Sequence, residues 1–329
     1  MPGETINSTF LTGYVLTTLD TNPVVFAPTN IIQSTGSSAL TANFAYNWSI
    51  QNAGTIQVVS GTAGSAAIAL DNAALTNAGS GRIAGFSAGI YIAGAGTVSN
   101  QGTISSSQNT GSGYTYSTLD NTATIVSAAV ILGHGSVTNA ASALISGGLG
   151  GVGIDGNGSV SNAGSVIGGQ FGVFIEGGGN LSNATTGTIG GSIYGVYGGV
   201  AGPLSVVNQG RIAASTGRGI ELLGGGSVTN TGSGTIAAAQ YGIRADLFAA
   251  TIVNAGVVNG TARAGAIFRV GGSLTNAVGG TITGSIAGFA AVGALATTVT
   301  NAGSLGGYNF GAVIYSANAQ FTNSGSVSS

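Results

Sequence analysis

The fold is decided by a seven-residue stretch, Val160-Ser161-Asn162-Ala163-Gly164-Ser165-Val166. On both sides of its central Asn-Ala-Gly, apolar β-branched residues alternate with small polar ones, as in two short strands joined by a turn. Because the side chains of a strand point alternately to opposite faces, Val160 and Val166 are expected to face inward and the serines outward. The stretch therefore predicts a strand, a turn marked by asparagine and a second strand.

The same asparagine recurs along the 329 residues of the chain, each time with an apolar residue two positions before it. It occurs at Asn52, Asn77, Asn100, Asn139, Asn162, Asn183, Asn208, Asn230, Asn254, Asn276, Asn301 and Asn323. The successive gaps are 25, 23, 39, 23, 21, 25, 22, 24, 22, 25 and 22 residues. Apart from the gap of 39, each is close to one turn of a three-sided solenoid. The pattern predicts an all-β protein, a parallel β-helix (β-solenoid) of about 12–13 coils of 21–25 residues, over residues 48–329.

The recurring asparagines are predicted to form a ladder. Stacked coils lie about 4.8 Å apart, so equivalent side-chain amides can hydrogen-bond to one another and satisfy polar groups buried at the turn. Inward-facing turns would hide these amides, which argues against ligand binding by them. From Asn77 to Asn301, the distance from each asparagine to the next inward aliphatic residue alternates between six and four residues. This predicts alternating long and short turns and a two-coil unit of about 46 residues.

Composition narrows the classes of function. The chain has 62 glycines and only 4 % charged residues, yet 43 % hydrophobic residues, which is too many for a disordered chain. Lysine is absent and the formal charge is −2, so a nucleic-acid partner, which needs a dense basic face, is not expected. No apolar run is long enough for a transmembrane helix. With no cysteine to supply thiolate ligands, we expect neither a metal nor another cofactor.

Two segments of the repeat, Thr97–Ile104 and Ser227–Ile236, resemble repeats in the β-helical passenger domains of bacterial autotransporter adhesins. The resemblance covers roughly residues 48–329. It implies a right-handed helix and a protein that is extracellular or located at the bacterial cell surface.

Two groups of charged residues are candidates for a role beyond the repeat. Aligning the coils on the glycine before a second strand places Asp155 and Glu176 at equivalent outward positions, with a spacing that would suit a retaining glycosidase. No basic or aromatic residues accompany this pair, which favours a non-enzymatic protein. The same alignment stacks Glu221 on Arg244, and Asp246 on Arg269. These four residues are predicted to form ion pairs between coils that set the register, each contributing less than about 1 kcal/mol if exposed.

The gap of 39 residues contains an insertion near residues 105–121. It includes a candidate recognition loop with Tyr114, Tyr116 and Asp120, in which paired tyrosines could stack on a sugar ring. An ordinary polar loop is the other interpretation. The only histidine, His134, has no partners at metal-ligand spacing and is predicted to be a turn residue.

The two ends of the sequence suggest an assembly. Residues 1–47 lack the repeat and are predicted to cap the first coil or to pair with another subunit. The C-terminal segment stops within the repeat, and an uncapped coil offers unpaired backbone groups to a second chain. Because such a head-to-tail contact does not close, it produces a filament. We therefore expect a non-enzymatic structural protein that assembles with itself into a surface or matrix filament, as in a biofilm. The alternatives are an adhesin that binds glycans or cell surfaces, and a polysaccharide-active enzyme.

Overall fold

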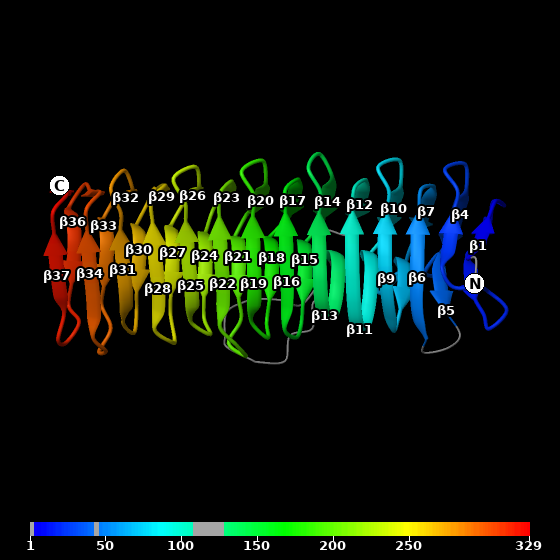
Figure 1. Cartoon of the computed structure of the whole chain (residues 1–329), viewed down its shortest axis with the longest axis horizontal. Coiled ribbons are helices and arrows are strands. Elements are labelled where there is room, and N and C mark those ends of the chain that lie inside the picture. The colour runs from blue at the N-terminus through cyan, green and yellow to red at the C-terminus, as the bar shows by residue number, and fades with distance from the viewer. Residues whose placement is uncertain (1–2, 43–45, 108–127) are drawn as a thin grey trace. The chain divides into compact units, whose positions relative to one another are not determined.

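The computed structural model describes residues 3–42, 46–107 and 128–329, and these contain β-strands and no helix. The chain divides into two compact units, Met1–Gly169 and Gln170–Ser329. In each unit, parallel strands are stacked in the coils of a β-solenoid (Figure 1). A coil has three strands, whose positions we call side 1, side 2 and side 3 in chain order. Side 2 ends at the recurring asparagine.

In the first unit, each strand pairs in parallel with the strand on the same side of the next coil. Side 1 consists of Tyr14–Leu16 (β2), Leu40–Ala42 (β5), Ala66–Leu70 (β8), the first parts of Ala88–Asn100 (β11) and Ala128–Asn139 (β13), and Gly150–Ile154 (β15). Side 2 consists of Glu4–Ile6 (β1), Val24–Phe26 (β3), Asn47–Asn52 (β6), Asn72–Asn77 (β9), the later parts of β11 and β13, and Gly158–Asn162 (β16). Side 3 consists of Ile31–Thr35 (β4), Thr55–Ser60 (β7), Arg82–Gly85 (β10), Thr103–Ser106 (β12), Leu144–Gly147 (β14) and Ser165–Gly168 (β17).

The second unit repeats the same parallel pairing. Side 1 consists of Phe171–Ile175 (β18), Tyr194–Gly198 (β21), Arg218–Leu222 (β24), Tyr241–Ala245 (β27), Ala264–Phe268 (β30), Ala287–Ala291 (β33) and Phe310–Ile314 (β36). Side 2 consists of Gly179–Asn183 (β19), Leu204–Asn208 (β22), Gly226–Asn230 (β25), Ala250–Asn254 (β28), Gly272–Asn276 (β31), Thr297–Asn301 (β34) and Gln320–Asn323 (β37). Side 3 consists of Thr188–Gly191 (β20), Arg211–Ala214 (β23), Thr235–Ala238 (β26), Val257–Gly260 (β29), Thr281–Gly284 (β32), Ser304–Gly307 (β35) and Ser326–Ser328 (β38).

The N-terminal segment follows the same three-sided path although its sequence lacks the repeat. Strand β1 pairs with β3, and β3 pairs with β6, where Phe26 lies opposite Asn52. In these first coils the position of the recurring asparagine is held by Ile6 and Phe26. The described residues before 43 therefore contribute coils of their own, with an apolar side chain in place of the amide.

The core of each unit lies inside the coils and consists of aliphatic residues. The alternation predicted for the glycine-led strands is confirmed, because Ile90, Ile92, Val152 and Ile154 are fully buried. The leading glycine reflects a close approach between two sides of the coil. A Cβ atom at Gly172 would lie 2.6 Å from Cγ2 of Ile189, a contact too short for any side chain. Glycine allows this close approach of side 1 to side 3 at Gly172, whereas Ala67 and Ala129 hold the equivalent position in two coils of the first unit.

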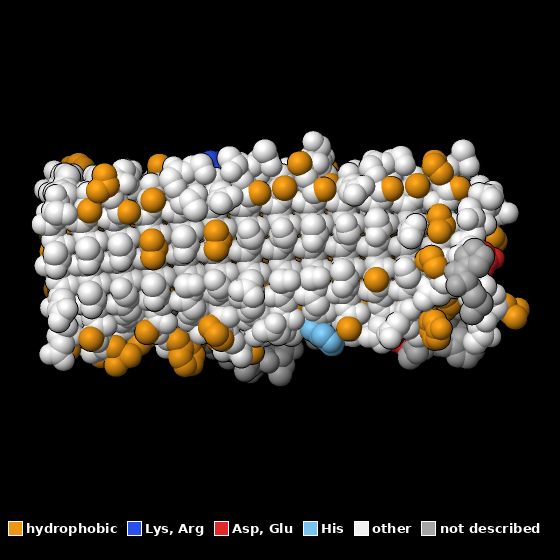
Figure 2. All heavy atoms as spheres, viewed as in Figure 1, with side chains coloured by type: hydrophobic (Ala, Val, Ile, Leu, Met, Phe, Trp, Pro, Cys, Tyr) orange, Lys and Arg blue, Asp and Glu red, His pale blue; other side chains and the backbone are white. Residues whose placement is uncertain are grey.

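The outer surface of side 2 carries few charges. In the second unit its outward positions form a row of hydroxyl-bearing residues in register: Ser205, Ser227, Thr251, Ser273 and Thr298. Figure 2 shows this face, with apolar side chains gathered along its two borders over the turns and almost no charged side chain. No described segment forms a helix long and apolar enough to cross a membrane.

Candidate functional site

Two stacks of polar side chains run from coil to coil, and the first is the asparagine ladder. In the first unit the Asn52 amide donates to Oδ1 of Asn77 at 2.8 Å, and the same contact links each asparagine to the next as far as Asn162. In the second unit the series runs from Asn183 to Asn323 at 2.7–2.8 Å. The ladder asparagines before Asn323 are buried. Each links two coils and leaves its amide closed to ligands, which matches a structural role.

The amide of each ladder asparagine also closes its own turn, and the turns differ in length. Asn208 donates to the carbonyl of Gly210, two residues on, whereas Asn230 donates to the carbonyl of Gly234, four residues on. The two forms alternate from Asn183 to Asn301, as the sequence predicts. The alternation ends at Asn323, whose short turn follows the short turn of Asn301.

The last described coil of the second unit leaves its inward positions exposed. Phe321 lies in register with Val299, and Val327 with Leu305. Phe321 and Val327 are each 42 % exposed, whereas Val299 is 1 % and Leu305 is 0 % exposed. Asn323 donates only within its own turn, to the carbonyl of Gly325. The ladder and the core thus present an open face at this coil.

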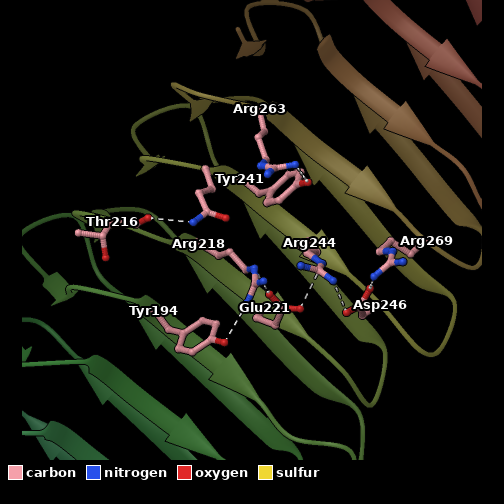
Figure 3. A network of polar contacts seen from close by, with 10 residues as sticks. Tyr194, Thr216, Arg218, Glu221, Tyr241, Arg244, Asp246, Arg263 and Arg269 are labelled. Atoms are coloured by element: carbon pink, nitrogen blue, oxygen red, sulfur yellow. Dashed lines mark hydrogen bonds and ion pairs between the residues drawn. The ribbon is translucent and has the colours of Figure 1, made fainter. Parts of the chain in front are cut away.

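The second polar stack lies on the outer surface of side 1 in the second unit and is charged. We call it the arginine network (Figure 3). Glu221 in β24 lies opposite Arg244 in β27, as the sequence alignment predicts. The contacts continue in both directions, because Arg218 Nε lies 3.0 Å from Glu221 and Arg269 Nη1 lies 3.2 Å from Asp246.

Arg244 holds the middle of the arginine network. Its Nε lies 3.5 Å from Glu221 Oε1, and its Nη2 lies 2.6 Å from Asp246 Oδ2. The charges along the network therefore alternate in sign, with an arginine at each end. Such an order is favourable because each carboxylate lies between two guanidinium groups.

Glu221 is the buried member of the network, with a side chain that is 2 % exposed. Burial raises the pKa of Glu221 to about 7, against the opposing attraction of Arg218 and Arg244. The sequence predicts an effect below about 1 kcal/mol only for exposed ion pairs. Glu221 is buried, so that bound does not apply to it, because a carboxylate taken out of water interacts more strongly with its neighbours and is costly to desolvate.

Two tyrosines support the arginines, from a neighbouring coil for Arg218 and Arg263 and from the same strand for Arg244. The Arg218 guanidinium lies 5.5 Å from the ring centre of Tyr194 and donates to its hydroxyl at 2.8 Å. The Tyr241 ring lies 5.6 Å from Arg244 and 5.7 Å from Arg263. Cation–π contacts of this kind hold guanidinium groups in place without neutralising them.

The two carboxylates considered for catalysis, Asp155 and Glu176, lie in different units. The backbone N–H of Asp155 donates to the carbonyl of Leu132, which fixes the turn after β15. Glu176 accepts a hydrogen bond from the backbone N–H of Val200 at 3.2 Å. A Cβ atom at Gly199 would lie 1.9 Å from the Glu176 carboxylate, so the glycine leaves room for it. Glu176 thus has a structural contact in the next coil.

The remaining candidates are placed as follows. Tyr114, Tyr116 and Asp120 of the candidate recognition loop lie outside the described residues. His134 is exposed in β13, between the parts of this strand that belong to side 1 and side 2. Within the described ranges, no three His, Cys, Asp or Glu side chains come together as metal ligands.

Sequence reasoning missed Arg218, Tyr194 and Tyr241, and a signal for them was present. Each precedes the glycine that leads a side 1 strand, so the alignment that paired Glu221 with Arg244 also places these three residues in one column. The structure has this register, with Arg218 between the two tyrosines.

Comparison with known proteins gives no relative, because no family model, curated protein or solved structure matches the chain.

Proposed function

We propose that the protein is a non-enzymatic structural protein that assembles head to tail, through the open face of its last described coil, into an extracellular filament. The observation that carries this proposal is the identical parallel pairing of successive coils, in which Phe321 and Val327 hold positions that are buried in the coil before. A further coil on this face would remove that apolar surface from water, which favours association. The proposal is that a second copy of the chain supplies the coil.

Backbone chemistry supports the same contact. Strands β36, β37 and β38 pair with the preceding coil on one edge, and their other edge faces away from it. Unpaired strand edges bind further strands by main-chain hydrogen bonds. A chain added in parallel would repeat the pairing already present between successive coils. Because the two contacting surfaces differ, the contact is open-ended and leads to a filament.

The first coil could receive the last coil of a second copy, because it also exposes apolar side chains. It differs from the repeated coils in having no asparagine at the ladder position. It exposes apolar side chains at Leu11, which is 62 % exposed, and Leu19, which is 89 % exposed. Its side 2 strand carries Ile6 at the ladder position, so Asn323 would meet an aliphatic side chain. Such a junction would rely on apolar contact and backbone pairing, without the amide link. It should therefore dissociate more readily than two coils of one chain separate.

The location is part of the proposal. The resemblance of the repeat to passenger domains of autotransporter adhesins supports the cell surface or the surrounding matrix. A filament built from a chain with almost no charged side chains suits a structural role there.

Sedimentation velocity over a range of concentrations tests the proposed assembly. The wild type is expected to form species that grow with concentration, and Phe321→Ser should shift the onset to higher concentration by about tenfold or more. The control is Val278→Ser, which removes an 82 % exposed valine from a turn. A wild type that remains monomeric at high concentration, or two variants with equal effect, would contradict the proposal.

A further inference from the structure

Positive charge is concentrated in one part of a chain that is negative overall. Four of the six arginines, Arg218, Arg244, Arg263 and Arg269, lie in three successive coils of the second unit. Only two acids, Glu221 and Asp246, accompany them there, so the region carries two positive charges while the whole chain carries −2. The outer surface of side 1 is thus opposite in sign to the rest of the protein.

The two carboxylates lie closest to Arg218 and Arg244 and leave Arg263 and Arg269 more available. Glu221 lies between Arg218 and Arg244, and Asp246 lies closest to Arg244. Arg269 Nη1 lies 3.2 Å from Asp246 Oδ1, a carboxylate that also contacts Arg244, and the Arg269 side chain is 52 % exposed. Arg263 contacts no carboxylate in the described part of the chain, and its one hydrogen bond is a long one of 3.4 Å to the Tyr241 hydroxyl. Most donors of the Arg263 guanidinium are therefore free.

Arg263 and Arg269 are held on a firm support. They flank β30, whose five residues are all buried. Both arginines are contacted from the preceding coil, which contains β27. There the Tyr241 ring contacts Arg263, and Asp246 contacts Arg269. At about 3.3 Å per residue, the two arginines lie about 20 Å apart along the strand direction. A single small anion cannot bridge this distance, whereas an extended polymer can.

Uncharged polar side chains lie in the turns before the side 1 strands of this region. The turns before the side 1 strands carry Thr216, Gln240 and Thr261, in successive coils. The Gln240 side-chain amide donates to the backbone carbonyl of Thr216 at 3.2 Å. The Thr261 hydroxyl donates to the carbonyl of Ala239 at 3.1 Å. With these donors directed at the backbone, the hydroxyl and amide oxygens are acceptors of the kind that bind sugar hydroxyls.

We propose that the outer surface of side 1 between residues 216 and 269 binds an acidic polysaccharide. Carboxylates of the polymer would bind Arg263 and Arg269, whose planar guanidinium groups suit bidentate recognition of carboxylate. Its hydroxyl groups would bind the neighbouring amide and hydroxyl side chains. Nucleic acid is a poorer match, because its closely spaced phosphates call for many cations and only two arginines are available. This site is independent of the open coil face.

Binding of polygalacturonate to the purified chain tests the proposal, with fully methyl-esterified polygalacturonate as the uncharged ligand. The double variant Arg263→Gln/Arg269→Gln is expected to lose about tenfold or more in affinity. The matched control is Arg82→Gln/Arg211→Gln, which removes two exposed arginines of side 3 and changes the net charge equally. Thermal unfolding of both variants should match that of the wild type, because the four side chains are exposed.

The possible outcomes distinguish a specific binding site from general electrostatic attraction to the chain. Loss of binding in the first variant alone, together with weak binding of the ester, supports the proposal. An equal loss in both variants would mean that net charge alone acts and would overturn it. Absence of binding by the wild type would overturn it as well. Equally tight binding of single-stranded DNA through the same arginines would replace it with a site for any polyanion.

Discussion

The asparagine ladder and the arginine network are both stacks of polar side chains, but they differ in charge and in repetition. The ladder is neutral and uses the same residue in nearly every coil, so each amide has the same partners above and below. The arginine network occurs once, spans three coils and alternates in sign. A stack that repeats can be extended by one more identical coil, whereas a stack that occurs once marks one place on the surface. The repeated coils, through their apolar core and strand edges, therefore suit assembly, and the network suits recognition.

The largest expected effect comes from breaking the ladder in its middle. Asn230→Ala removes the link to Asn254 and leaves the Asn208 amide without its acceptor in the next coil. Buried polar groups without partners cost about 1–3 kcal/mol each, so we expect a loss of about 2–4 kcal/mol in the free energy of unfolding. Urea denaturation measures this loss.

The control for the ladder is Asn180→Ala, an exposed asparagine on the outer surface of side 2. It is expected to change the free energy of unfolding by less than about 0.5 kcal/mol. Equal effects of the two substitutions would show that the ladder does not stabilise the stack.

A second substitution, Glu221→Gln, removes the buried carboxylate of the arginine network and tests how its charge affects stability. The pKa of Glu221 is raised in the folded state to about 7 from an ordinary value of 4.5. The folded protein therefore retains a proton that the unfolded chain releases between these two values, so stability falls as the pH rises through this window. Above pH 7 this loss is complete, and it amounts to at most about 3 kcal/mol.

Glu221→Gln removes the titrating group and should remove this loss. Compared with the wild type, the variant is expected to gain stability progressively from pH 5 to pH 8, as measured by urea denaturation at each pH. Substituting the exposed Asp71 by Asn is the control for loss of one carboxylate outside the network. Parallel pH profiles of wild type and Glu221→Gln would contradict the burial argument.

The smallest effect concerns turn length. Deleting Thr231 and Gly232 converts the long turn after Asn230 into Asn-Ser-Gly-Thr, the form of the short turns. The short turns after Asn301 and Asn323 already lie in neighbouring coils. We therefore expect the deletion to lower the free energy of unfolding by less than about 1 kcal/mol. Inserting Thr-Gly after Asn208 instead makes three neighbouring long turns, and crowding should make it the more destabilising change. Thermal unfolding of the two variants tests this order.

Much of the fold could be predicted because one side-chain pattern carries it. The spacing of Asn162 and its equivalents predicts the coils, and the aliphatic residue two positions earlier indicates the inward face. The first coils could not be predicted this way, because Ile6 and Phe26 fill the ladder position with apolar side chains. Strand pairing with the next coil, rather than an asparagine, sets their register.

The arginine network was only half predictable. The alignment on the glycine before side 1 gave the Glu221–Arg244 contact, since residues in register between coils lie one strand spacing apart. It could not give the burial of Glu221 or the second contact that Arg244 makes with Asp246 in its own coil. Those depend on how side chains cover the outer surface, which no repeat in the sequence encodes.

Electron microscopy of the purified chain at two concentrations tests whether the face of the last coil drives end-to-end assembly. We expect unbranched filaments, one chain in width, that lengthen with concentration and are lost at the same concentrations in Phe321→Ser. Separate particles of single-chain size at both concentrations, or sheets formed by side-by-side association, would contradict it.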